Sequence, residues 1–71
     1  MRRFTFEEEQ RSAHELQFMP DKDYIVLERT IGDIAENDSY SKSYIVEVLN
    51  KLAKSRGLSY TTVLMIYIQS K

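Results

Sequence analysis

The polar side chains best suited to hold a nucleic acid lie between residues 41 and 56. Serine, asparagine, lysine and arginine side chains hydrogen-bond to phosphate oxygens and to base edges. The candidate DNA-binding residues of this stretch are Ser41, Lys42, Ser43, Asn50, Lys51, Lys54 and Arg56. For the last three, a solvated helix end is an equally good interpretation, because cations near a helix C-terminus interact favourably with the helix dipole.

One acidic residue, Glu47, interrupts this basic stretch. It stands four residues before Lys51, a spacing at which opposite charges pair along one helix. If it faced DNA instead, its carboxylate could accept a hydrogen bond from the amino group of a cytosine. We favour the intrahelical pair.

Residues suited to catalysis or metal binding are scarce in this chain. It has one histidine, His14, no cysteine and no Gly-rich loop that could cradle a phosphate. His14 lies between Arg11 and Glu15, which are spaced for a side-chain pair on the wet face of a helix, and it is expected to be exposed. The sequence therefore predicts that the protein is not an enzyme and has no cofactor or metal site.

Charge is distributed unevenly along the chain, although the formal net charge is only −1. Residues 1–41 contain five Lys or Arg against ten Asp or Glu, whereas residues 42–71 contain five Lys or Arg against a single Glu. An anionic partner such as double-stranded DNA would therefore meet the C-terminal half. The acidic N-terminal half offers a separate surface for a protein partner.

The chain is expected to form four helices in one domain that spans residues 1–71. A first helix should run from about Phe6 to Phe18. Thr5 and Glu8 have the spacing of a capping box, which would begin this helix, and Pro20 would end it.

A second helix should begin near Asp21, which could cap it, and continue to about Asn37. Apolar residues recur there at helical spacing, at Tyr24, Leu27, Ile31 and Ile34. The segment DYIVLERT is also rich in β-branched residues, so a short strand at residues 23–28 is the alternative.

A third helix is expected from Ser41 to Arg56, with Gly57 as a left-handed stop, and Ser59 could cap a fourth. The fourth segment, YTTVLMIYIQ, is also rich in β-branched residues, so a strand at residues 60–68 is the alternative. Its apolar residues have helical spacing and extend over more than one face, which we expect to join two copies of the chain across a two-fold axis. The expected dimer-interface residues are Val63, Leu64, Tyr67 and Ile68.

The expected fold class is therefore all-α. A domain of this size buries a modest core, so self-association would help to stabilise it. No apolar run approaches the roughly 18 residues that a membrane span needs. Together with the absence of cysteine, this pattern predicts a cytoplasmic protein without contact to a membrane.

Residues 30–50, TIGDIAENDSYSKSYIVEVLN, resemble the helix-turn-helix of bacterial repressors of the lactose-repressor family. The positions identical to that family are Thr30, Ile31, Asp33, Ala35, Ser41, Ser43, Val48, Leu49 and Asn50, and Ile34, Tyr40 and Ile45 replace other apolar residues. The resemblance implies that Ala35 permits close helix packing, that Tyr40 fills the space under the turn, and that the helix from Ser41 reads a major groove.

A second helix-turn-helix frame overlaps the first in AKSRGLSYTTVLMI, residues 53–66. Its turn residue Gly57 fits the geometry better, but the residues that would face DNA are mostly apolar, which is typical of a core or dimer helix. A ribbon-helix-helix over residues 41–70 would need a strand before Ser41, and no convincing one is found.

Two functions follow from these patterns. The first is a small DNA-binding transcriptional regulator that acts as a homodimer. The second is a protein-protein interaction module, a small adaptor or inhibitor of a larger protein, whose contact surface is the acidic N-terminal helix. We favour the first because of the 21-residue resemblance and the basic C-terminal half.

Overall fold

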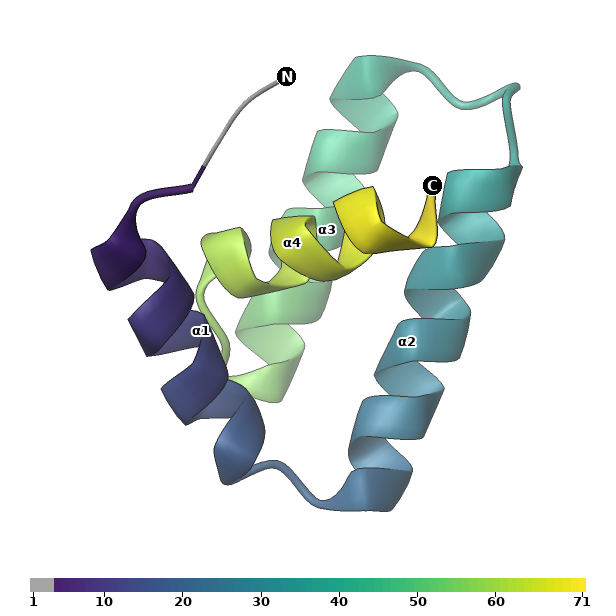
Figure 1. Ribbon diagram of the computed structural model, residues 1–71. Helices are drawn as coiled ribbons and strands as arrows, with labels where there is room; N and C mark the ends of the chain where they lie inside the picture. The colour runs from purple at the N-terminus through teal and green to yellow at the C-terminus, as the bar shows by residue number, and fades with distance from the viewer. Residues whose placement is uncertain (1–3) are drawn as a thin grey trace.

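Four helices make up the regular structure in the computed structural model of this protein, which describes residues 4–71. Their bounds are α1 Phe6–Gln17, α2 Asp21–Glu36, α3 Lys42–Arg56 and α4 Tyr60–Ser70 (Figure 1). No strand occurs in this part of the chain, so the residues at 23–28 and at 60–68 are helical. The all-α prediction is confirmed.

The last helix, α4, holds the other three together. It contacts α1, α2 and α3 in turn, whereas the backbones of those three helices rarely approach one another. Figure 1 shows α4 lying across the molecule, with α1 and α2 on either side and α3 behind. The buried apolar core is made by α2, α3 and α4, and it consists of Leu27, Ile31, Leu49, Ala53, Val63, Ile66 and Tyr67.

Three helices begin with a capping side chain, and the caps of α1 and α4 are those predicted from the sequence. Thr5 accepts a hydrogen bond from the backbone N–H of Glu8, whose carboxylate accepts one from Thr5 N–H, as a capping box requires. Ser41 caps α3, and Ser59 caps α4. Each side-chain oxygen accepts an N–H that has no partner inside the helix.

The predicted cap of α2 is wrong. Asp21 is the first residue inside the helix, and Pro20 stands at the cap position without a side-chain hydrogen bond. The Pro20 carbonyl accepts the backbone N–H groups of Asp23 and Tyr24, each at 3.0 Å. The proline ring fixes φ near −60°, and the Pro20 carbonyl accepts the first backbone hydrogen bonds of the helix. This helix therefore starts without a side-chain cap.

The two connections on either side of α3 differ in geometry. Gly57 ends α3 with φ 69°, and Leu58 N–H returns to the carbonyl of Ala53 at 2.8 Å, so only three residues separate α3 from α4. These two helices pack against each other. Five residues, 37–41, join α2 to α3, and those helices meet mainly through α4.

The first helix-turn-helix frame therefore does not pack as the resemblance implied. Ala35 is half-buried against the shared core. Tyr40 is exposed and its ring lies 4.7 Å from that of Tyr44, so it does not fill the space under the turn. In the described chain, α2 and α3 each pack against α4 rather than against each other.

None of the helices in residues 4–71 combines the length and the apolar character that crossing a membrane demands.

Candidate nucleic-acid interface

The face of α3 that points away from the core is exposed along its whole length. With 3.6 residues per turn, Leu49 and Ala53 face inward, and the opposite side of the helix faces solvent. The exposed residues on that side of the helix are Ser43, Tyr44, Glu47, Asn50, Lys51, Lys54 and Ser55. We call this surface the outer face of α3.

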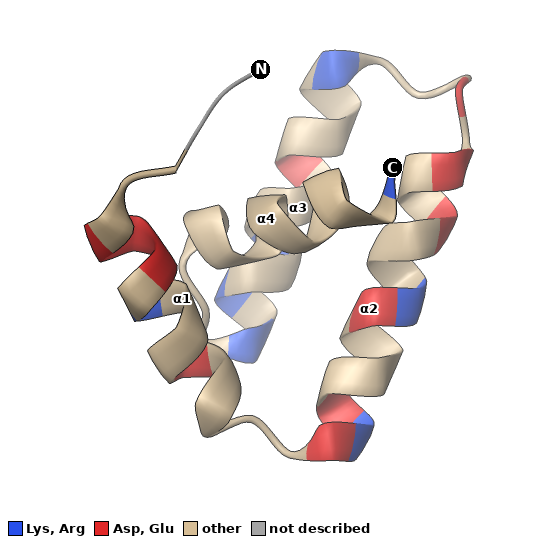
Figure 2. Cartoon of the chain, in the orientation of Figure 1, with Lys and Arg blue, Asp and Glu red and all other residues tan. Residues whose placement is uncertain are grey.

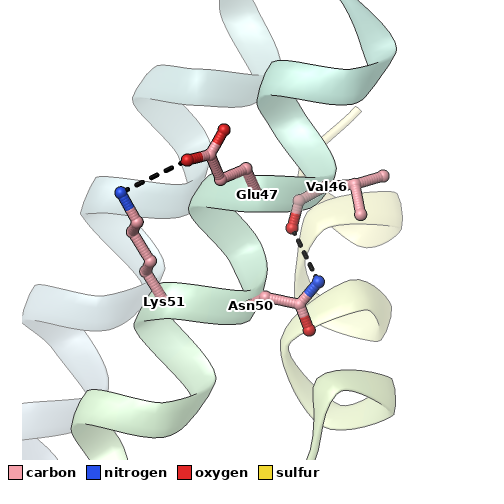
Figure 3. Close-up of polar contacts among 4 residues, drawn as sticks. All are labelled: Val46, Glu47, Asn50 and Lys51. Carbon is pink, nitrogen blue, oxygen red and sulfur yellow. Dashed lines mark hydrogen bonds and ion pairs between the residues drawn. The ribbon is translucent and has the colours of Figure 1, made fainter.

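Figure 2 shows how charge is distributed over the helices: acidic residues gather on the first turn of α1 and along α2, and basic residues on α3. The only acidic residue of α3 is Glu47. Its carboxylate lies 3.4 Å from the ammonium of Lys51, which confirms the predicted pair (Figure 3). In the part of the chain that the structure describes, no carboxylate lies within ion-pair distance of Lys54.

Asn50 makes a local hydrogen bond on this face. Its side-chain amide donates from Nδ2 to the carbonyl oxygen of Val46, one turn earlier, at 3.1 Å (Figure 3). A bidentate contact to adenine needs both the amide N–H and the amide oxygen. The bond to Val46 uses one of the two amide N–H groups, so the second N–H and the amide oxygen of Asn50 stay available for such a contact.

The seven predicted DNA-binding residues are only partly brought together. Ser43, Asn50, Lys51 and Lys54 share the outer face of α3. Ser41 stands at its N-terminal end, where its Oγ accepts the N–H of Tyr44 at 3.2 Å.

The remaining two predicted residues lie beside that face. Lys42 lines a groove between the start of α3 and the end of α4, next to Leu64. Arg56, at the other end of α3, lines a separate cleft with Glu15 and Phe18. Both side chains are exposed, but neither extends the outer face of α3.

The predicted dimer residues of α4 need a correction. Val63 has no exposed surface and Tyr67 has 8%, so both belong to the core of a single chain, whereas Leu64 and Ile68 are half-buried. The expectation that one chain cannot cover this helix is wrong for Val63, because α1, α2 and α3 all pack against α4, and Tyr67 keeps only a narrow exposed edge.

A polar cluster between α1 and α4 was missed by the sequence analysis, which placed Glu15 on a wet face. The Glu15 carboxylate accepts the backbone N–H of Ser59 at 2.9 Å and the hydroxyl of Thr62 at 2.8 Å. Ser12, itself buried, lies 3.0 Å from the Thr62 hydroxyl oxygen. The sequence feature that could have indicated this cluster is the spacing of Ser12 and Glu15, which lie three residues apart and therefore on one side of α1.

The electrostatics of Glu15 suit a structural role. Partial burial alone would raise the pKa of its carboxyl, but the Ser59 N–H and the hydroxyls of Thr62 and Ser59 stabilise the carboxylate. Together with the positive charge of Arg11 they lower the pKa below its ordinary value. A carboxylate held ionised by several donors is a poor proton donor near neutral pH.

The single histidine is exposed, as predicted, and its ring forms an edge-type contact with the ring of Phe18, with ring centroids 4.9 Å apart. Among residues 4–71, no three His, Asp or Glu side chains are grouped so that they could hold a metal ion.

No protein-family model matches the chain, and no curated protein or solved structure does either. The similarity of residues 30–50 to the lactose-repressor family thus rests on those residues alone.

Proposed function

We propose that this protein is a small cytoplasmic DNA-binding transcriptional regulator that places the outer face of α3 in a major groove. The observation that carries the proposal is the exposure of this face, which no other helix covers and which bears Ser43, Asn50, Lys51 and Lys54. An α-helix fits the width of the major groove, and these side chains can contact phosphates and base edges.

The separation of acidic and basic residues between helices also supports an orientation in which the outer face of α3 meets the DNA. The acidic residues of α1 and α2 lie on helices other than α3 (Figure 2). If the outer face of α3 meets DNA, α1 can point away from the duplex, which keeps Glu7 and Glu9 from repelling its phosphates.

Glu47 is the residue that opposes this proposal, since a carboxylate repels phosphates. Its ion pair with Lys51 reduces that repulsion. Next to a cytosine the same carboxylate would accept a hydrogen bond from the amino group, which would make it a residue that selects sequence.

The test is retardation of a short duplex by the purified protein at low salt, followed by a salt titration. The double variant Lys51→Ala/Lys54→Ala should bind every duplex more weakly, with a slope of log K against log [salt] that is shallower by up to about 2. The control is Lys22→Ala/Arg29→Ala, which removes two exposed cations from α2.

The control variant should bind like the unmodified protein. If the unmodified protein fails to retard duplex DNA at low salt, or if both double variants lose the same affinity, the outer face of α3 is not a DNA-binding surface.

A second candidate function is a protein-protein interaction module, and one observation favours it. Phe6, at the start of the acidic helix α1, keeps 74% of its surface exposed. An exposed aromatic side chain is typical of a protein interface. Under this hypothesis, Phe6→Ala would abolish binding to a protein partner.

A further inference from the structure

A groove of about 230 Å³ lies between the start of α3 and the end of α4. Apolar side chains form most of its surface, and a lysine stands at the start of α3 and another just after α4. The lining residues are Lys42, Ile45, Val46, Leu64, Tyr67 and Lys71. An occupant that matches this groove is apolar at its centre and negatively charged on both sides.

The position of Lys71 fits a groove that is open to a ligand. Its ammonium lies 5.0 Å from the centre of the Tyr67 ring, within the range of a cation–π contact. Neither Lys71 nor Lys42 forms an ion pair with the described residues of its own chain. Both charges are therefore available to carboxylates from outside.

The first turn of α1 has the complementary arrangement. Phe6 is the most exposed large apolar side chain of those described, and helical geometry places Glu7 and Glu9 on either side of it. Both carboxylates are exposed, and no ion pair within residues 4–71 engages them. Glu8 differs, because it is part of the capping box with Thr5.

From this match we infer that the groove binds the first turn of α1 from a second copy of the chain. Phe6 of one copy enters the apolar part of the groove, and Glu7 and Glu9 lie beside Lys42 and Lys71 of the other. Phe6 is exposed in its own chain, so it does not fill its own groove. A two-fold axis makes the contact reciprocal, and both grooves are then filled.

This interface retains part of the dimer predicted from the sequence. Leu64 and the exposed edge of Tyr67 line the groove, while Val63 stays in the core. The contact leaves Asn50 and Lys54 on the outer face of α3 uncovered. The inference goes beyond the proposed function and does not depend on it, since the dimer forms without DNA.

The experiment is sedimentation equilibrium of the chain without DNA over a range of protein concentrations, at low and at high salt. The unmodified chain should be a dimer that weakens as salt screens the ion pairs. Phe6→Ala should raise the dimer dissociation constant by roughly tenfold or more. Phe18→Ala is the matched control, because Phe18 is similarly exposed at the opposite end of α1 and should leave the dimer intact.

Charge reversal identifies the pairing. Lys42→Glu/Lys71→Glu and Glu7→Lys/Glu9→Lys should each be monomeric alone and should form a heterodimer when mixed, because mixing restores opposite charges at both contacts. Each variant changes exposed side chains only, and circular dichroism checks that it keeps its helices.

An unmodified chain that is monomeric at every concentration would overturn the inference. So would a dimer that survives Phe6→Ala and both charge reversals. Because no DNA is present, either outcome leaves the proposal for α3 to be judged by its own binding experiment.

Discussion

The carboxylate of Glu15, in the last turn of α1, accepts a hydrogen bond from the backbone N–H of Ser59, 44 residues later in the chain and 2.9 Å away. Ser59 is the cap of α4, so this acceptor lies where the N–H groups of a helix lack partners of their own. A negative charge is also favoured there by the helix dipole. One side chain thereby attaches α1 to the helix that holds the fold together.

Replacing that carboxylate should weaken the whole domain. Glu15→Ala removes a charged acceptor from Ser59 and Thr62, and we expect it to lower the free energy of unfolding by about 1–3 kcal/mol. Urea denaturation followed by circular dichroism measures the change. Gln10→Ala, on the exposed side of the same helix, should stay within about 0.5 kcal/mol of the unmodified protein. Equal losses in both variants would contradict the assigned role of Glu15.

Acidification should remove the contribution of Glu15 in a defined direction. Its pKa is lowered on folding from the ordinary value of 4.5, so the stabilisation is fully present above that pH. As the pH falls through 4.5 and then through the lower pKa of the folded state, the carboxyl becomes protonated and the stabilisation is lost. The difference in unfolding free energy between the unmodified protein and Glu15→Gln should therefore be largest near neutral pH and smaller at pH 3. A difference that is independent of pH would rule out this linkage.

The two glycines should respond to alanine with opposite signs. Gly57 has φ 69°, and nothing lies within 4 Å of an added Cβ, so Gly57→Ala should cost about 1–2 kcal/mol through backbone strain alone. Gly32 lies inside α2 with equally open space, so Gly32→Ala should stabilise the protein by about 0.5–1 kcal/mol. Thermal melts of both variants under identical conditions test the pair. If Gly57→Ala left the melting temperature unchanged or raised it, the left-handed backbone at Gly57 would not carry the expected strain for other residues.

The local parts of this structure could be predicted from the sequence because the signals are themselves local. Thr5, Ser41 and Ser59 cap helices through bonds to residues three positions away, and Gly57 ends α3 through its own backbone angle. The cap of α2 was mispredicted because Asp21 is a residue type that often caps helices. In the structure the Pro20 carbonyl accepts the first N–H groups of α2, and no side chain caps it.

The remaining differences concern how the helices meet, which spacing along one helix does not determine. Glu15 has the spacing of an exposed ion pair with Arg11, and only the docked position of Ser59 turns it inward. Val63 belongs to a helix that is apolar on most sides, and such a helix looks the same in sequence whether its own chain or a second copy covers it. The outer face of α3 was partly predicted, since a single periodicity separates Leu49 and Ala53 from Asn50 and Lys54.

The position of α4 also has a consequence for how the chain acquires its structure. Until residues 60–70 have been synthesised, α1, α2 and α3 lack their common partner, and isolated helices of 12, 16 and 15 residues are marginal in water. During synthesis, residues 4–59 are therefore expected to lack stable tertiary packing until α4 is available. The packed arrangement of α1, α2 and α3 is expected to form only when α4 can contact all three.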